Sequence, residues 1–167
     1  MENKNNKRHW KFSTVFIIAI LLVVIANLFK LTYLLGFEFG KISTGYKPQE
    51  VEMIEILNVQ REKIGLHKLT ENGLLNLSAR NKACDMGNKS YFSHISPDGK
   101  QPWEFIKDAG YLYNHAGENI SKNNDIKKAM VDFMNSQEHK DNILSQNYKE
   151  VGVGICGEYL VQHFASK

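Results

Sequence analysis

An uninterrupted apolar segment near the N-terminus divides this chain into two unequal parts. Residues 12–29 read FSTVFIIAILLVVIANLF, and the only polar residues among these 18 are Ser13, Thr14 and Asn27. As an α-helix the segment rises about 27 Å, close to the roughly 30 Å hydrocarbon core of a bilayer. The sequence therefore predicts a transmembrane helix over residues 12–36, and the rest of the chain must fold without it.

The charges that flank this segment predict its orientation. Residues 1–11 carry a net charge of +3, and basic residues stay on the cytoplasmic side of a membrane. We expect a cytoplasmic basic tail over 1–11, a signal-anchor over 12–36, a linker over 37–47 and an extracellular domain over 48–167 of a single-pass membrane protein. A secreted protein after signal cleavage and a buried core helix are the alternatives. The uncleaved anchor is favoured because VIANLFK lacks a small-x-small cleavage site.

Charge outside the tail is balanced. Residues 1–11 hold four of the 21 basic and one of the 18 acidic residues, which leaves 17 of each in the remainder. Proteins that bind nucleic acid usually present a basic face. The composition therefore argues against nucleic acid as a partner.

Hydrophobic periodicity predicts several helices followed by a hairpin. Apolar residues at helical spacing indicate helices over about 49–64, from a Thr70 cap to about 88, over 102–110, and from an Asn124 cap onward, with a further turn from Ser136. Residues 151–155 then alternate valine or isoleucine with glycine, and a second apolar run follows Gly157, as in a β-hairpin.

The run GVGICG at 152–157 matches the glycine spacing of a dinucleotide-binding loop. That fingerprint requires a following helix and an acidic residue about 20 positions on, but only ten residues follow Gly157 and they resemble a strand. We reject the dinucleotide site. Glycine at alternate strand positions instead predicts close approach of a neighbouring element to one strand face.

A dispersed set of polar residues carries the candidate chemistry. His94 precedes a Ser-Pro-Asp-Gly turn, Glu118 follows Gly117 in AGENI, and His139 lies in SQEHKDNIL. Taken singly, each has a structural explanation, since a lone histidine is more often a satisfied polar residue than a ligand.

Taken together, the ordered motifs resemble a known family. YFSHISPDG, AGENI, HKDNIL, YKEVGVGI and YLVQHF are similar in order and spacing to the bacterial CAP domains, the superfamily of cysteine-rich secretory, antigen 5 and pathogenesis-related 1 proteins. The resemblance spans about residues 50–165. It implies an α+β fold, a three-layer α-β-α sandwich with a central cleft.

The resemblance also implies which residues line that cleft. His94 and Glu118 match the family's cleft histidine and glutamate, and His139 matches the histidine of its bacterial Ser-Pro-Gly-His segment. Tyr159 stands at the fourth position, where the family pattern has a histidine. His163 shares strand parity with Tyr159 and is the remaining candidate.

Cys84 and Cys156 both fall in the part predicted to be exported. An oxidising compartment allows a disulfide between them, whereas two separate buried thiols are the alternative. The sequence leaves both possibilities open.

Three functions remain. The first is a binding module whose His/Glu cleft recognises a lipid, peptide or cell-envelope ligand, with or without a divalent metal. The second is a metal-dependent hydrolase or peptidase-like enzyme, with Glu118 as general base and Zn²⁺ or another divalent metal on His94, His139 and Glu118. The third is a structural polar network. We favour the binding module and expect no nucleic-acid partner.

Overall fold

The computed structural model describes residues 16–27, 30, 47–123 and 125–167. Residues 16–27 form a helix with exposed side chains, while most of the predicted tail, span and linker (1–11, 12–36, 37–47) lies outside the described residues. Among the residues described, no helix has the length and apolar character needed to cross a bilayer. The chain forms two compact units, and the second, Tyr46–Lys167, contains the sheet and both sites described below.

The second unit is built around a four-stranded sheet with the order β1-β3-β4-β2. β1 pairs parallel with β3, and the β3–β4 and β2–β4 pairs are antiparallel. The predicted hairpin is therefore confirmed. The helices are α2 (Pro48–Glu62), α3 (Gly73–Asn88), α4 (Pro102–Asp108), α5 (Ile126–Asn135) and α6 (Gln137–Leu144), and the strands are β1 (Thr70–Glu71), β2 (His115–Ser121), β3 (Glu150–Cys156) and β4 (Tyr159–Ser166).

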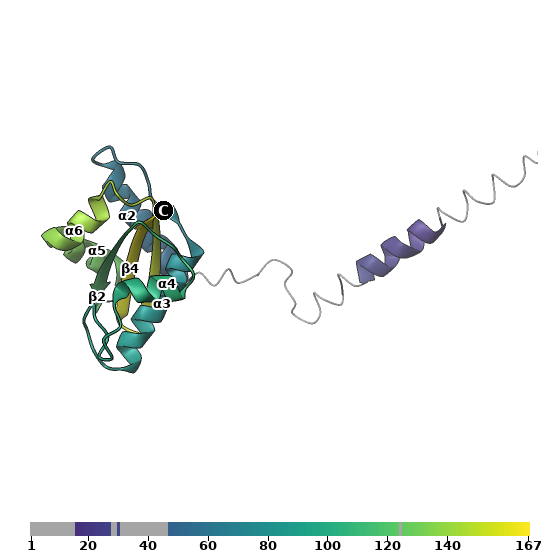
Figure 1. Ribbon diagram of the computed structural model, residues 1–167. Coiled ribbons are helices and arrows are strands. Elements are labelled where there is room, and N and C mark those ends of the chain that lie inside the picture. Colours follow the sequence, from purple (N-terminus) through teal and green to yellow (C-terminus); the bar gives the residue numbers. More distant parts are fainter. Residues whose placement is uncertain (1–15, 28–29, 31–46, 124) are drawn as a thin grey trace, which may run out of the picture. The chain divides into compact units, whose positions relative to one another are not determined.

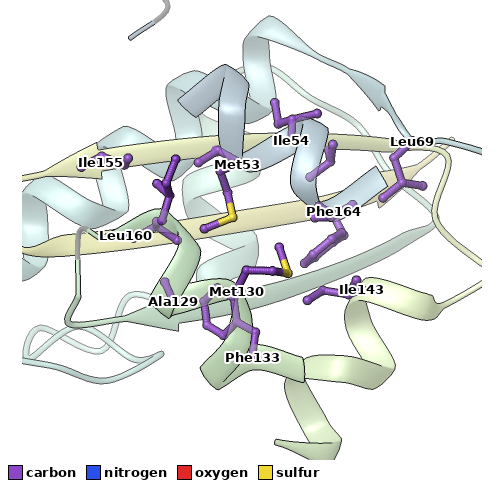
Figure 2. Packing of buried hydrophobic residues seen from close by; sticks show 14 residues of the cluster. Met53, Ile54, Leu69, Ala129, Met130, Phe133, Ile143, Ile155, Leu160 and Phe164 are labelled. Carbon is purple, nitrogen blue, oxygen red and sulfur yellow. The ribbon is translucent and has the colours of Figure 1, made fainter. Parts of the chain in front are cut away.

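Helices cover both faces of the sheet (Figure 1). On one face α2, α5 and α6 bury a large core with β3 and β4, in which Met53, Phe133 and Phe164 are almost fully buried (Figure 2). On the other face α3 and α4 pack against β2 and β4 through two smaller clusters that include Ala83 and Ile106. These three layers are the α-β-α arrangement that the resemblance implied.

Gly152 and Gly154 lie where α3 crosses β3. A Cβ atom on Gly152 would overlap the backbone of α3 at Leu75, and one on Gly154 would overlap it at Ala79. The backbones of helix and strand are therefore in direct contact, and only glycine fits at these two positions. This confirms the predicted close approach.

Two helix caps differ from the sequence expectation. The Asn72 side chain accepts hydrogen bonds from Leu74 N and Leu75 N and caps α3, whereas Thr70 belongs to β1. Residue 124 lies outside the described residues, and the cap of α5 is Asp125. In both places the observed cap is the residue directly before the first helical residue.

A disulfide joins α3 to the end of β3. Cys84 and Cys156 are bonded, with their Cα atoms 5.1 Å apart and 72 residues between them in sequence. The structure thus selects the bridge over two free thiols. Together with the two glycines, it fixes α3 against the sheet.

Candidate functional site

A glutamate and a histidine on neighbouring strands form the centre of the site. Glu118 on β2 and His163 on β4 are directly opposite each other in the antiparallel ladder, and both are buried on the face covered by α3. His163 Nε2 lies 2.9 Å from Glu118 Oε2. On its other side, His163 Nδ1 lies 2.7 Å from the hydroxyl of Ser78 on α3.

His94 completes this chain of polar contacts from a loop. Its Nδ1 lies 2.7 Å from Glu118 Oε1, so the two carboxylate oxygens each face one imidazole. The His94 side chain is 52% exposed, whereas those of Glu118 and His163 are at most 1% exposed. Nε2 of His94 makes no hydrogen bond within the described part of the chain. His94 is thus the solvent-facing end of a buried Ser78–His163–Glu118 series.

Lys82 fixes the loop that carries His94. This lysine is on α3 and is fully buried, and its Nζ donates to the backbone oxygens of Ser93 and His94, both at 2.8 Å. A third bond, 3.0 Å long, goes to the hydroxyl of Tyr91. All three ammonium protons are therefore used to position the loop.

A second set of contacts ties the same loop to the end of α3. The Asp85 carboxylate accepts from Tyr91 at 2.5 Å and from the Ser96 hydroxyl at 2.6 Å. Lys89 pairs with both Asp85 and Asp98. The loop has no regular secondary structure, so these side-chain contacts hold His94 over Glu118.

The contacts within the site lower the pKa of Glu118 and raise the pKa of His94. Burial by itself would raise the pKa of Glu118, but the hydrogen bonds from His163 and His94 outweigh it and the pKa is lowered. The hydrogen bond with Glu118 raises the pKa of His94. His94 therefore keeps its second proton to a higher pH than a free histidine does, and in that protonated form Nε2 carries an N–H that Glu118 does not use.

Ser78, His163 and Glu118 share the residue types of a hydrolytic triad but not its accessibility. Ser78 is fully buried, and its hydroxyl also bonds to Leu75 O at 2.9 Å. A nucleophile must reach the substrate, which a hydroxyl sealed beneath α3 does not. The serine therefore holds His163 in place.

His139 lies beside this series on a different element. It is near the start of α6, half-buried against Phe133 with ring centroids 5.0 Å apart, and Asn119 donates to its backbone oxygen. Burial, followed by the charge of His94, lowers the pKa of His139. His139 is thus a neutral imidazole close enough to sense the His94 charge.

The predicted metal ligands His94, His139 and Glu118 do not assemble as a set. Both oxygens of Glu118 face imidazole nitrogens, and within the described ranges no three His, Cys, Asp or Glu side chains are grouped to hold a metal ion. A cation bound by all three residues would have to displace these hydrogen bonds.

Tyr159 occupies a different part of the same strand face. It packs in the cluster formed with α3, and its ring lies 6.5 Å from that of exposed Phe92. His163, four residues further along β4, contacts Glu118 instead. The position beside Glu118 therefore belongs to His163 and not to Tyr159.

Sequence reasoning missed Ser78 and Lys82 as parts of the site. Both lie on the face of α3 that also buries Leu75, Ala79 and Met86. A serine and a lysine on an otherwise apolar helix face were the available signal, because a buried lysine requires polar partners.

A family comparison agrees with this geometry. The model of the cysteine-rich secretory protein family, CAP, matches residues 54–164. The chain belongs to the CAP family. The CAP domain thus accounts for the second compact unit and includes the Glu118, His94 and His163 site.

Curated relatives share the domain but are longer. The protein YkwD of Bacillus subtilis is 39% identical over 121 residues, which cover 71% of this chain and 47% of the relative. The B. subtilis membrane protein YlbC is 30% identical over 119 residues, covering 71% of this chain and 34% of the relative. The chain therefore spans less than half the length of either, and both bear the description "uncharacterized".

Solved structures share the fold. An extracellular SCP-domain protein of Bacillus anthracis superposes with a TM-score of 0.69 at 26% identity, covering 71% of this chain and 40% of the other. An outer surface protein of Borrelia burgdorferi has a TM-score of 0.67 at 17% identity, covering 72% of this chain and 94% of the other. The latter likeness concerns the fold alone.

Proposed function

We propose that this CAP domain is an extracellular binding module in which the exposed His94 holds the anionic group of an amphiphilic cell-envelope ligand, a lipid. The observation that carries the proposal is the half-exposed His94, whose ring is held by Glu118 and whose pKa that hydrogen bond raises. Its loop neighbours Phe92 and Ile95 are 49% and 47% exposed. A cationic N–H between two exposed apolar side chains suits an anionic head joined to an apolar chain.

Binding of a fluorescent fatty acid to the purified chain tests this proposal. His94→Gln removes the charge-assisted hydrogen bond and should weaken binding about tenfold or more. Because the pKa of His94 is raised above 6.5, affinity should hold below that pH and fall as the pH rises through the folded pKa. Leu112→Ala, at a residue 76% exposed elsewhere, is the control. Equal affinity in wild type and His94→Gln would reject the proposal.

The location proposed for the domain is the outer side of the cell membrane, held there by the segment 12–36. Residues 16–27 support this, because they form a helix of exposed, mainly apolar side chains. The names of the relatives point the same way, since one is called a membrane protein and one an extracellular protein. Protease added to intact cells should remove the CAP domain and leave a short N-terminal fragment. A mature chain that begins after residue 36 would mean cleavage and secretion.

Zinc is a second candidate ligand of the same site. The favouring observation is that Glu118 binds Nδ1 of His94, an arrangement that leaves Nε2 available and is common around zinc-bound histidines. His94 and His139 would be the ligands, and Glu118 would orient His94. Calorimetric titration should show zinc binding that weakens as pH falls, because the imidazoles must be neutral. Unchanged affinity in both His94→Gln and His139→Gln would exclude this site.

A further inference from the structure

A pocket of about 270 Å³ opens at the end of the sheet where β1 and β3 begin. Two chain segments form it, the turn after α2 at 65–68 and the loop before β3 at 146–149. Its lining contains Arg61, Lys68 and Lys149 together with His67, and it contains no aspartate or glutamate. The pocket is therefore strongly cationic, although the CAP domain as a whole is not.

Arg61 is the unusual member of this lining. It is 3% exposed, and its Nε and Nη1 donate to the backbone oxygens of His67, Ile143 and Ser145 at 2.7–2.9 Å. These bonds join the two segments that form the pocket. Within the described part of the chain no carboxylate pairs with the guanidinium, and burial alone lowers its pKa.

A buried cation without a counter-ion is costly, because buried charges are normally paired. Nη2 of Arg61 makes no hydrogen bond among the described residues, although Nε and Nη1 are both occupied. Lys68 forms an exposed ion pair with Glu62 at 3.2 Å. Among the described residues Lys149 pairs with no carboxylate, and its Nζ makes one long hydrogen bond, 3.4 Å, to the backbone oxygen of Gln146. Within the described ranges Arg61 and Lys149 thus have no carboxylate partner, and an anion bound in the pocket would supply the counter-charge.

We infer that this pocket binds a phosphate group. The two hydrogens of Arg61 Nη2 can donate to phosphate oxygens while Nε and Nη1 keep their backbone partners, and the ammonium groups of Lys68 and Lys149 suit the remaining negative charge. The pocket is separate from the His94 site, because none of its lining residues is a hydrogen-bond partner of His94, Glu118 or His163 in the described structure. The phosphate proposal therefore does not depend on the lipid proposal.

Titration of the purified full chain with inorganic phosphate, followed by calorimetry at low and high salt, tests the site. Lys149→Gln removes one cation without disturbing the Arg61 bonds, and it should weaken phosphate binding about fivefold or more. Lys128→Gln, at an exposed lysine of α5 outside the pocket, is the matched control and should change little. His94→Gln should leave phosphate affinity unchanged, which separates this pocket from the His94 site.

The two possible sources of the phosphate are distinguished by a second arm with phosphatidylglycerol vesicles. Vesicle binding that Lys149→Gln weakens identifies a lipid headgroup, and vesicle binding that it leaves unchanged identifies a free phosphate. The proposal is overturned if the wild-type chain binds no phosphate at millimolar concentration. It is equally overturned if Lys149→Gln and Lys128→Gln weaken binding to the same extent, because phosphate affinity would then depend on the net charge of the protein and not on the pocket.

Discussion

Replacing Glu118 by glutamine should destabilise the domain, because the carboxylate is the hydrogen-bond partner of both His94 and His163. The carboxylate accepts from His163, which is fully buried, and from His94, which is 52% exposed. Glutamine keeps the shape but offers one acceptor oxygen and an NH₂ group in place of two acceptors. At least one imidazole N–H then faces another donor.

The expected cost follows from burial. Leaving a buried donor without its charged acceptor costs about 1–3 kcal/mol, whereas a solvent-screened pair is worth about 1 kcal/mol or less. His94 is half exposed, so its N–H can form a hydrogen bond with water instead. His163 is buried, so water cannot replace the carboxylate as its partner. Where the glutamine oxygen faces His163, that bond loses its charged acceptor and His94 faces an NH₂ group, so we expect the free energy of unfolding to fall by about 2–3 kcal/mol.

The same substitution should flatten the dependence of stability on pH. The folded pKa of Glu118 lies below its ordinary 4.5, so its contribution is present above pH 4.5 and is lost as the pH falls through the folded pKa. The folded pKa of His94 lies above 6.5, so its contribution is complete below pH 6.5 and is lost as the pH rises through the folded value. The pair stabilises the wild type most between these limits, and Glu118→Gln should lose that maximum.

Urea denaturation followed by far-UV circular dichroism, repeated across this pH range, measures both effects. Glu55→Gln is the control, because Glu55 is an exposed residue of α2 and its loss should change stability by less than about 0.5 kcal/mol. The reasoning is refuted if Glu118→Gln costs no more than Glu55→Gln. It is also refuted if the pH profile of Glu118→Gln matches that of the wild type.

Three further perturbations test the frame around the site. Replacing Cys84 and Cys156 by alanine opens a cross-link over 72 residues and should lower the free energy of unfolding by about 2–5 kcal/mol in urea; an unchanged midpoint would contradict this. Gly152→Ala places a Cβ in the backbone of α3 and should cost about 3 kcal/mol or more, whereas Gly87→Ala, whose Cβ makes ordinary contacts at 3.6 Å, should be nearly neutral in the same assay. Lys82→Met removes three hydrogen bonds to the His94 loop, so amide exchange in residues 91–98 should accelerate; protection equal to that of the wild type would show that Lys82 does not hold the loop.

Periodicity predicted individual helices and the hairpin because it is a local signal, and the resemblance to the CAP domains implied how they are layered. Residues 126–133 predicted an amphipathic helix, and the alternation at 151–155 predicted a strand that something approaches closely; both are found. The caps at Asn72 and Asp125 were missed because several capping residues stand side by side there. Choosing among them requires the chain direction, which only the packed structure supplies.

The site was harder to predict because its contacts depend on register. Strand parity placed Tyr159 and His163 on one face, but which of them meets Glu118 is decided by the β2–β4 pairing, 45 residues apart in sequence. Ser78 and Lys82 joined the site only when α3 was placed over β4. Arg61 belongs to a pocket between two loops, and no sequence pattern brings those loops together.

The contact between α3 and β3 has a consequence for how this domain can vary. Ser78 and Lys82 belong to the helix, whereas Glu118 and His163 belong to the sheet, so the 2.7 Å between Ser78 and His163 depends on the thickness of the helix–sheet interface. Gly152 and Gly154 determine that thickness without touching any ligand. A larger residue at either position would separate the two halves of the site, and ligand affinity would then change although every ligand-facing side chain stayed the same.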